Sequence, residues 1–213
     1  MRALRLFQSS LAVAVLKLLD ERPMHPYEMQ QLIRERHLDD VFKLSSGSLY
    51  HAVERLVRVG LIAGLDTNRA GRRPERTVYA ITDAGRDAFQ AWLRRLLSEP
   101  AKEYPQFATA LACMVHLQPA EVVRLLQHRL LLLEGALAAG ARIQQGATAG
   151  GLSRLHLIEF EYGQMLQGAE VVWLRGLIDD IADGTLDGMA DWVALHAGRA
   201  SEGAAQRSEE VPP

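Results

Sequence analysis

The sequence is poor in cysteine and in aromatic residues, and it has no long apolar run. It contains one cysteine, Cys113, among 213 residues, and 6% of the residues are Phe, Trp or Tyr. A single thiol forms no internal disulfide and cannot build a cysteine metal site. No run of about 18 uncharged apolar residues occurs, so the sequence predicts no transmembrane helix. The first residues are too lightly apolar for a secretion signal and lack a cleavage site, so we expect a cytoplasmic protein.

The residue patterns on which catalysis and metal binding depend are also absent. The seven histidines form no HExxH pair, and there is no P-loop or glycine-rich dinucleotide turn. The aspartates between residues 179 and 187 lack the calcium-loop pattern. His156 with Glu159 and Glu161 is a local cluster that a solvated helix face explains. We therefore expect no enzyme activity, no catalytic or metal-binding residue and no cofactor.

Charge is distributed unevenly, although the net charge is only −2. Residues 1–99 contain 16 Lys and Arg against 12 Asp and Glu, which gives +4. The remaining residues contain 8 against 14, which gives −6. A basic N-terminal half and an acidic C-terminal half indicate two different roles.

Three short helices are predicted near the N-terminus. Ser9 and Ser10 favour the start of a helix that runs to about residue 19, and Pro26 favours the start of a second at residues 27–36. Ser45 or Ser46 caps a third, which ends at Gly60, a residue suited to the left-handed conformation. Helices of this size in this order are typical of a helix-turn-helix.

The third helix has one apolar face and one polar face. Leu49, Val53, Leu56 and Val57 share one side at helical spacing. The other side carries small, hydroxyl and basic residues, which suit a helix that enters the major groove of DNA, because arginine can bind guanine O6 and N7. A solvated surface helix is the alternative interpretation.

An arginine-rich loop follows this helix between two β-prone segments. Leu61, Ala63 and Leu65 alternate, and the segment 78–81 is also β-prone. The connector 67–76 carries four arginines and suits the tip of a hairpin that contacts phosphates or a minor groove, although it could be merely solvated. Its position after the third helix favours the wing of a winged helix.

A fourth helix is expected from the capping sequence that begins at Thr82 to about residue 97, and Pro100 and Pro105 mark a domain boundary. Several motifs in residues 10–97 are shared with one known family: His25-Pro26-Tyr27-Glu28-Met29, Gly47-Ser48-Leu49-Tyr50, Arg55-Leu56, Gly60-Leu61-Ile62, Arg72-Arg73-Pro74 and Tyr79-Ala80-Ile81-Thr82-Asp83-Ala84-Gly85. In these motifs the sequence resembles the phenolic-acid-decarboxylase-regulator (PadR) family. The resemblance implies a dimeric winged-helix regulator, commonly a repressor, that binds a palindromic operator in double-stranded DNA. The expected DNA-binding residues are Tyr27, Lys43, Gly47, Ser48, Tyr50, His51, Arg55, Arg69, Arg72, Arg73 and Arg76.

The second half is predicted to be helical throughout. After a short apolar helix over residues 107–117, long helices are expected over residues 119–145 and 152–182, separated by a glycine-rich break at 146–151. Apolar residues on both long helices are spaced alternately by three and four, as in a coiled coil. Further apolar residues lie off this seam, so each helix is expected to bury two sides, which favours a homodimer. The expected dimerisation residues are Leu126, Leu130, Leu133, Leu137, Tyr162, Met165 and Val172.

Two other functions remain open from the sequence. The first is a receptor for a small aromatic effector in a pocket lined by Trp92, Met165 and Trp173, although such residues are usually core. The second is a helical interaction scaffold whose winged helix binds protein instead of DNA.

Together these patterns predict a mainly α fold with one small β-hairpin. We expect a winged helix-turn-helix DNA-binding domain at residues 1–99, an all-α dimerisation domain at 106–184 and a disordered tail at 197–213. The predicted function is a dimeric, sequence-specific transcriptional regulator, a repressor released by a small-molecule effector, with no membrane partner.

Overall fold

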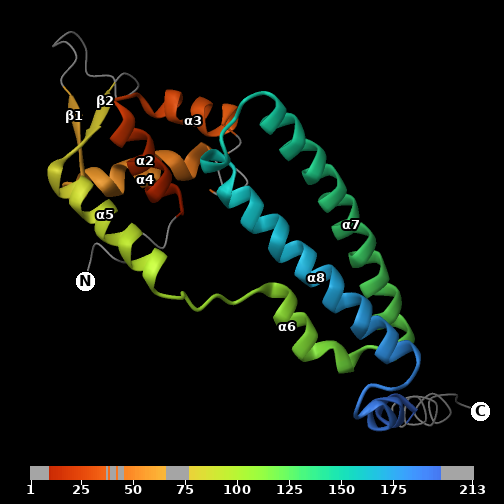
Figure 1. Cartoon of the computed structure of the whole chain (residues 1–213). Coiled ribbons are helices and arrows are strands. Elements are labelled where there is room, and N and C mark those ends of the chain that lie inside the picture. The colour runs from red at the N-terminus through yellow and green to blue at the C-terminus, as the bar shows by residue number, and fades with distance from the viewer. Residues whose placement is uncertain (1–9, 37, 39–41, 43–45, 66–76, 198–213) are drawn as a thin grey trace, which may run out of the picture. The chain divides into compact units, whose positions relative to one another are not determined.

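The computed structural model describes residues 10–36, 38, 42, 46–65 and 77–197. It divides into two compact units, Met1–Glu103 (unit 1) and Tyr104–Pro213 (unit 2), each of which we describe by itself (Figure 1). Within the described residues, no helix has the length and apolar character needed to cross a membrane.

Unit 1 consists of helices around a small hairpin. Its elements, in chain order, are α2 (Ser10–Glu21), α3 (Pro26–Glu35), α4 (Ser46–Arg58), β1 (Ile62–Leu65), β2 (Val78–Ile81) and α5 (Asp83–Ser98). Helix α2 is the central element, since its residues 11–16 and 18–19 are almost entirely buried. Met29 and Ile33 of α3 and the apolar side of α4 pack into the same core. The order of helices and strands agrees with the winged helix-turn-helix expected from the sequence.

The buried face of α4 differs from the predicted one at a single residue. Leu49, Val53 and Leu56 are buried, as expected, but Val57 is 41% exposed. Ala52 completes the buried face instead, at 5% exposure. Successive residues lie about 100° apart around a helix, so Val57 lies at the edge of a face that is centred between Leu49 and Leu56.

The hairpin is antiparallel, with Ile62 opposite Ile81 and Leu65 opposite Val78. Met24, in the short segment between α2 and α3, adds a bridge to the free edge of β2. Its amide donates to the carbonyl of Tyr79 at 3.1 Å, and the amide of Tyr79 donates back at 3.0 Å. This bridge ties the helix-turn-helix to the hairpin. Nothing in the sequence pattern predicted it.

The junction between α4, the hairpin and α5 depends on two glycines and a threonine. Gly60 ends α4 with φ +75°, the left-handed conformation that glycine favours. Thr82 caps α5 by accepting from the amide of Gly85 at 3.0 Å, and its hydroxyl donates to the carbonyl of Gly60 at 2.8 Å. A Cβ on Gly85 would lie 2.0 Å from the carbonyl oxygen of Leu61, so this close approach requires glycine.

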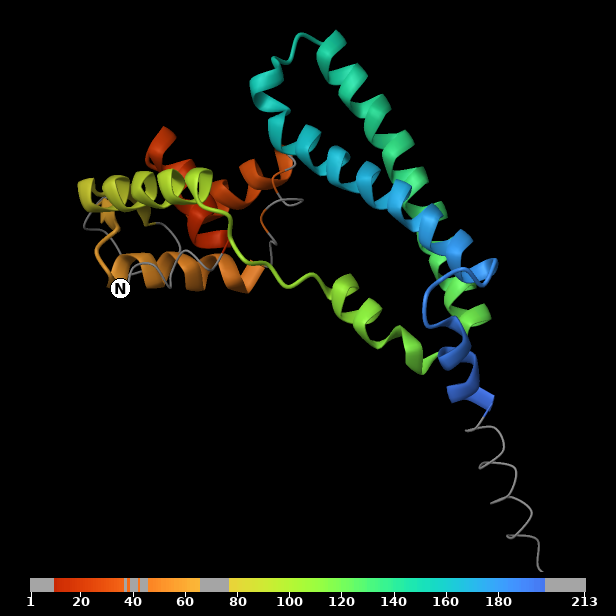
Figure 2. The same cartoon turned by 60° about the horizontal axis from the view of Figure 1, so that its bottom comes forward.

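Unit 2 is helical. Its elements are α6 (Gln106–Cys113), the 3₁₀ turn η3 (Met114–His116), α7 (Pro119–Ala149), the 3₁₀ turn η4 (Arg154–His156) and α8 (Ile158–Ala182), and residues 189–197 are also helical. Helices α7 and α8 lie side by side in both ribbon views (Figures 1 and 2). Val122 and Leu126 of α7 and Leu174 and Ile178 of α8 are buried together.

The predicted ends of the two long helices were wrong by a few residues. Helix α7 continues through Gly146 to Ala149, because one glycine inside a long helix costs only about 1 kcal/mol. The turn comes at Gly151, which has φ +84°. Helix α8 begins at Ile158 instead of Leu152, since the intervening residues form η4.

Polar contacts reinforce the packing of unit 2. Arg129 of α7 donates to Glu170 of α8 at 2.6 Å, and Arg175 of α8 donates to Glu134 of α7 at 2.6 Å. The indole N–H of Trp192 donates to the carbonyl of Leu117 at 2.9 Å and joins helix 189–197 to the turn after η3. Residues 198–213, most of the predicted disordered tail, lie outside the described residues.

Candidate nucleic-acid interface

Helix α4 turns a polar surface away from the core of unit 1. Successive residues lie about 100° apart around a helix. The residues on the side opposite Leu49, Ala52, Val53 and Leu56 therefore begin at Gly47 and follow at intervals of four, three and four residues. These positions, which we call the α4 outward face, are Gly47, His51, Glu54 and Arg58, and all are exposed.

Three predicted DNA-binding residues flank the α4 outward face. Tyr50 lies on one side and is 45% exposed. Arg55 lies on the other side and is exposed, and Ser48 is half-buried beside it. Of the predicted α4 residues, Gly47 and His51 are central and the other three lie at the edges. Along this side and its edges the helix thus offers hydroxyl, imidazole and guanidinium groups.

Sequence reasoning omitted Glu54 from this surface. The His51 side chain is 78% exposed and that of Glu54 is 67% exposed, with 3.5 Å between His51 Nδ1 and a Glu54 carboxylate oxygen. An acidic residue does not fit a basic DNA-binding pattern. The helical spacing from Gly47 and His51 was nevertheless a signal sufficient to find Glu54, as it was for Arg58, which the sequence already placed on the polar side.

Packing against the described residues does not require glycine at position 47. A Cβ built on Gly47 meets none of their atoms within 4 Å, in contrast to Gly85. A helix interior favours alanine over glycine by roughly 0.5–1 kcal/mol. The absence of a side chain at the start of α4 therefore suits close approach by another molecule.

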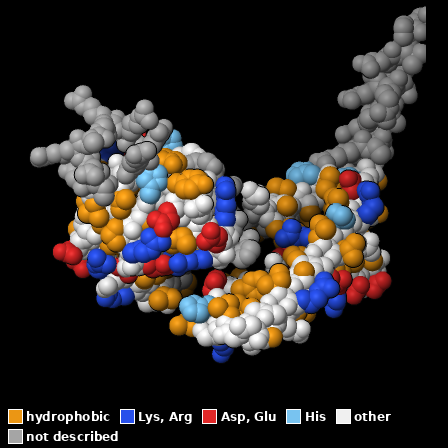
Figure 3. All heavy atoms as spheres, turned by 90° about the horizontal axis from the view of Figure 1, so that it is seen from above, with side chains coloured by type: hydrophobic (Ala, Val, Ile, Leu, Met, Phe, Trp, Pro, Cys, Tyr) orange, Lys and Arg blue, Asp and Glu red, His pale blue; other side chains and the backbone are white. Residues whose placement is uncertain are grey.

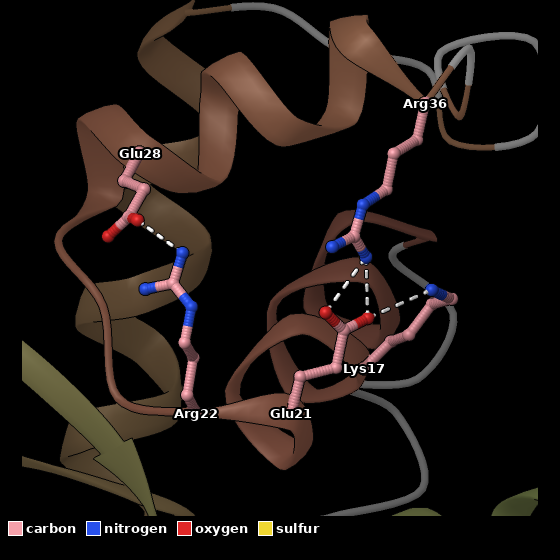
Figure 4. Close-up of polar contacts among 5 residues, drawn as sticks. All are labelled: Lys17, Glu21, Arg22, Glu28 and Arg36. Atoms are coloured by element: carbon pink, nitrogen blue, oxygen red, sulfur yellow. Dashed lines mark hydrogen bonds and ion pairs between the residues drawn. The ribbon is translucent and has the colours of Figure 1, made fainter.

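Ion pairs between α2 and α3 fix the helix that precedes α4. The guanidinium of Arg36 donates to both carboxylate oxygens of Glu21, at 2.6 and 2.8 Å, and Lys17 reaches the same carboxylate at 3.4 Å (Figure 4). Arg22, the residue after α2, pairs with Glu28 in the first turn of α3. The hydrogen bond from Arg36 lowers the pKa of Glu21 below its ordinary value.

The first turn of α3 is formed by the motif His25-Pro26-Tyr27. His25 caps the helix, since its Nδ1 accepts from the amide of Tyr27 at 3.1 Å. The other ring nitrogen, Nε2, is buried and has no hydrogen-bond partner among the described residues. The Tyr27 side chain, a predicted phosphate contact, is 59% exposed, and its hydroxyl accepts from Gln31 at 3.4 Å.

The remaining predicted DNA contacts cannot be placed. Lys43 and the loop arginines Arg69, Arg72, Arg73 and Arg76 lie outside the described residues. On the face seen in Figure 3, basic side chains lie beside acidic ones, so charge on that face is mixed. The structure therefore places Tyr27 and the predicted residues of α4, and it does not describe the other predicted contacts.

Comparison with known families identifies this unit. Residues 15–91, from within α2 to within α5, match the transcriptional regulator PadR-like family. The chain contains a PadR-like domain. The match covers α3, α4 and the hairpin, and it agrees with the resemblance found in the sequence motifs.

Solved structures share the fold of the chain over about four fifths of its length. Bacillus subtilis PadR in complex with operator DNA is 20% identical, covers 80% of this chain and 98% of that chain, and has a TM-score of 0.63. The same protein in complex with p-coumaric acid is 18% identical, with coverage of 81% and 96% and a TM-score of 0.61. The Vibrio cholerae virulence activator AphA is 20% identical, with coverage of 81% and 98% and a TM-score of 0.61. No curated protein sequence matches the chain.

The predicted dimerisation residues divide into two groups in unit 2. Leu126 is buried within the chain, and Leu130 and Leu133 pack against the same core. These leucines already have partners in their own chain, and Leu137 is half-buried. Tyr162, Met165 and Val172 of α8, in contrast, are 60%, 54% and 70% exposed.

The exposed group forms an apolar stripe on α8 opposite its buried residues Val171, Leu174 and Ile178. We call this stripe the α8 outward face, and its exposed residues are Ile158, Tyr162, Met165, Ala169 and Val172. Helix α8 is therefore apolar on two opposite sides, and the chain itself covers one of them.

The predicted effector residues do not come together in one unit. Trp92 packs against the core of the PadR-like domain and stacks on Phe89, whereas Met165 and Trp173 belong to unit 2. Trp173 contacts the edge of Phe107, with 6.4 Å between ring centroids.

Unit 2 contains an apolar cavity of about 380 Å³ that the sequence did not predict. Phe107, Met114 and Leu117 line one side of the cavity, and Val122, Leu126 and Arg129 line the other. The guanidinium of Arg129 lies 3.7 Å from the centre of the Phe107 ring and is bonded to Glu170. Among the described residues, no group of three or more His, Cys, Asp or Glu side chains is arranged to hold a metal ion.

Proposed function

We propose that the chain is a sequence-specific DNA-binding transcriptional regulator whose α4 enters the major groove. The observation that carries this proposal is the α4 outward face, an exposed polar side of the second helix of a helix-turn-helix. A groove-reading helix needs such a side, with hydrogen-bonding groups that are not used in packing. The PadR-like domain and the fold shared with an operator-bound regulator support the same function.

The residues of this domain have different roles in the proposal. Arg55 reads a guanine from the edge of α4, while Ser48, Tyr50 and His51 complete the contact with base edges. Tyr27 and Lys43 contact phosphates on the flank. The arginines of the predicted connector 67–76, which are Arg69, Arg72, Arg73 and Arg76, contact the DNA backbone or the minor groove beside the recognition helix.

The chain acts as a homodimer through the α8 outward face. Each protomer leaves Tyr162, Met165 and Val172 uncovered, and a second copy offers the same apolar stripe in return. Such pairing removes apolar surface from water at about 25 cal/mol per Å². Two recognition helices related by two-fold symmetry then bind a palindromic operator.

The regulator is a repressor released by a small aromatic effector, and the cavity in unit 2 is the proposed site. Its volume lies near the lower end of the range for small-molecule pockets. Phe107 and Leu117, which line the cavity, contact Trp173 and Trp192 respectively. A planar aromatic molecule such as a phenolic acid should therefore quench the fluorescence of Trp173 and Trp192.

One double variant and one linkage measurement separate the effector proposal from incidental binding. Trp173→Phe with Trp192→Phe removes the two indoles beside the cavity and should abolish the quenching that they report. The effector must weaken DNA binding, and DNA must weaken effector binding by the same factor. An aromatic compound that binds tightly and leaves DNA affinity unchanged would reduce the site to a cavity without a regulatory role.

The DNA-binding proposal is tested by selection from a randomised duplex library with the full-length protein. We expect one palindromic sequence to be enriched and its affinity to fall linearly with the logarithm of salt concentration. Arg72→Ala with Arg73→Ala should flatten that slope by about one unit for each lost phosphate contact, on selected and random duplexes alike. A chain that enriches no sequence and has no salt-sensitive affinity would be the helical scaffold instead.

A further inference from the structure

Glu54 is the part of the α4 outward face that a simple basic recognition helix does not explain. It lies between His51 and Arg58 on the side opposite the core, and its carboxylate is 67% exposed. Its position on that side is set by helical geometry, because Leu49, Val53 and Leu56 fix the orientation of α4. If α4 enters the groove as proposed above, the carboxylate of Glu54 enters with it.

The chemistry of the groove restricts what Glu54 can contact. Two anions repel, so the carboxylate does not bind a phosphate, and it also cannot donate to the acceptors on guanine. The major-groove edge of cytosine presents an N4 amino donor, and glutamate accepts from that group. Adenine N6 is also a donor, but adenine adds an N7 acceptor beside it, which a carboxylate cannot satisfy.

The neighbours of Glu54 make an acidic group tolerable at this surface. His51 Nδ1 lies 3.5 Å from its carboxylate, and Arg58 follows one turn later on the same side. Arg55 is the adjacent residue. A single negative charge among these groups costs little in long-range attraction to DNA, yet it penalises every duplex that lacks a donor at the matching position.

We propose that Glu54 is a specificity-determining residue that accepts a hydrogen bond from the N4 amino group of a cytosine in each operator half-site. This proposal rests on the proposed function, since it assigns a base to a residue of that interface. Under this proposal, the base preference at one operator position results from repulsion of other bases as much as from attraction to cytosine.

The test compares sequence selection by the full-length wild type with that by two variants. Glu54→Gln keeps the acceptor oxygen and adds an amide donor, the pair of groups that reads adenine N6 and N7. It should therefore change the selected cytosine to adenine at one position in each half-site. Glu54→Ala should lose the preference there by roughly ten-fold, while its affinity for random duplex rises several-fold because a repulsive charge is gone.

Controls separate this reading from a structural role and from failure of the proposed function. Asp87→Ala removes an exposed acid from α5 of the same unit and should leave the selected sequence unchanged. If both Glu54 variants select the wild-type sequence, Glu54 merely stabilises the helix through His51, and the inference is overturned while the function stands. If the wild type itself enriches no sequence, the proposed function fails and this inference fails with it.

Discussion

Helices α4 and α8 each have a side that faces away from the core of their unit, and the two sides differ in chemistry. On α4 that side carries a glycine, an imidazole, a carboxylate and a guanidinium, all exposed. On α8 it carries Ile158, Tyr162, Met165, Ala169 and Val172, which are exposed although apolar. One unit therefore leaves hydrogen-bonding groups uncovered, and the other leaves hydrophobic area uncovered.

This difference indicates what each side binds. Exposed polar groups lose nothing in water and gain from a partner with complementary donors, acceptors and charge, as a duplex groove offers. Apolar residues in a continuous stripe gain by leaving water, which requires another apolar surface. The same helical geometry thus fits both proposed roles, nucleic-acid recognition by unit 1 and self-association through unit 2.

The largest expected effect comes from placing charge on the α8 outward face. Tyr162→Asp with Met165→Asp should convert the dimer to a folded monomer, since each buried unpaired charge costs several kcal/mol. Sedimentation should show one chain mass where the wild type shows two. Val193→Asp, at an exposed residue of helix 189–197, adds charge elsewhere and should leave the dimer intact. A folded wild-type monomer at micromolar concentration would contradict the assignment of this face.

Substitutions on the buried side of α8 should change the free energy of unfolding instead of dimerisation. Leu174 is 0% exposed, and Leu174→Ala should lower the free energy of unfolding by about 2–5 kcal/mol, because it leaves a cavity between α7 and α8. Urea denaturation measures this loss. Leu166→Ala, on the same helix but 48% exposed, should cost far less. Equal losses would mean that α8 has no distinct inner and outer sides.

Base readout by the edge of α4 should have a smaller effect, confined to DNA. Arg55→Ala should weaken binding to the selected duplex by roughly 1–3 kcal/mol and hardly change binding to random duplex. Arg94→Ala removes an exposed arginine from α5 and serves as the matched control. If Arg55→Ala weakens binding to both duplexes equally, Arg55 contacts phosphate. Ser48, Tyr50 and His51 would then be the residues that contact the bases.

Gly47 allows binding and stability to be separated in one variant. The methyl group of Gly47→Ala meets no described atom in the free chain, so the variant should be as stable as wild type or more stable by less than roughly 1 kcal/mol, because Gly47 lies in the first turn of α4. The new methyl group should nevertheless weaken DNA binding, because it holds the start of α4 away from the groove. Thermal unfolding and duplex affinity measured on the same sample check both expectations. Unchanged affinity would show that this end of α4 does not approach DNA.

The smallest effect concerns the ion pair that joins α2 to α3. Arg36 lowers the pKa of Glu21, so the pair stabilises the fold above the ordinary glutamate value of 4.5 and this contribution is lost as pH falls through the lower folded pKa. Both side chains are partly exposed, so Glu21→Gln should cost about 1 kcal/mol or less at neutral pH. The difference from wild type should vanish in acid. A difference that persists in acid would assign the effect to something other than charge.

The local pattern of the sequence predicted unit 1 well, because its elements are short and strongly capped. Thr82 and Gly85 form the predicted cap of α5, and Gly60 ends α4 in the predicted conformation. The bridge between Met24 and Tyr79 could not be predicted, since it depends on how α2 packs against the hairpin. Glu54 was not predicted, because a negative charge does not fit a basic DNA-binding pattern, although its spacing from His51 places it on the outward side of α4.

Unit 2 was predicted less well, for a physical reason. Leucines in a three-four pattern require an apolar partner, but the pattern does not say whether that partner is the same chain or another. The seam on α7, around Leu126 and Leu130, is satisfied by α8, whereas the seam on α8, around Tyr162 and Met165, is not. Only the packing of the two helices shows which apolar stripe remains exposed.

The central claim is that the α4 outward face and its edge bind DNA while the α8 outward face binds a second copy. Sedimentation velocity of full-length protein with a labelled selected duplex tests both parts at once. Wild type should sediment as two chains on one duplex, and His51→Ala with Arg55→Ala should remain a dimer but leave the duplex free. Tyr162→Asp with Met165→Asp should yield folded monomers that hold the duplex weakly. A dimer lost in the α4 variant, or a dimer kept in the α8 variant, would contradict the account.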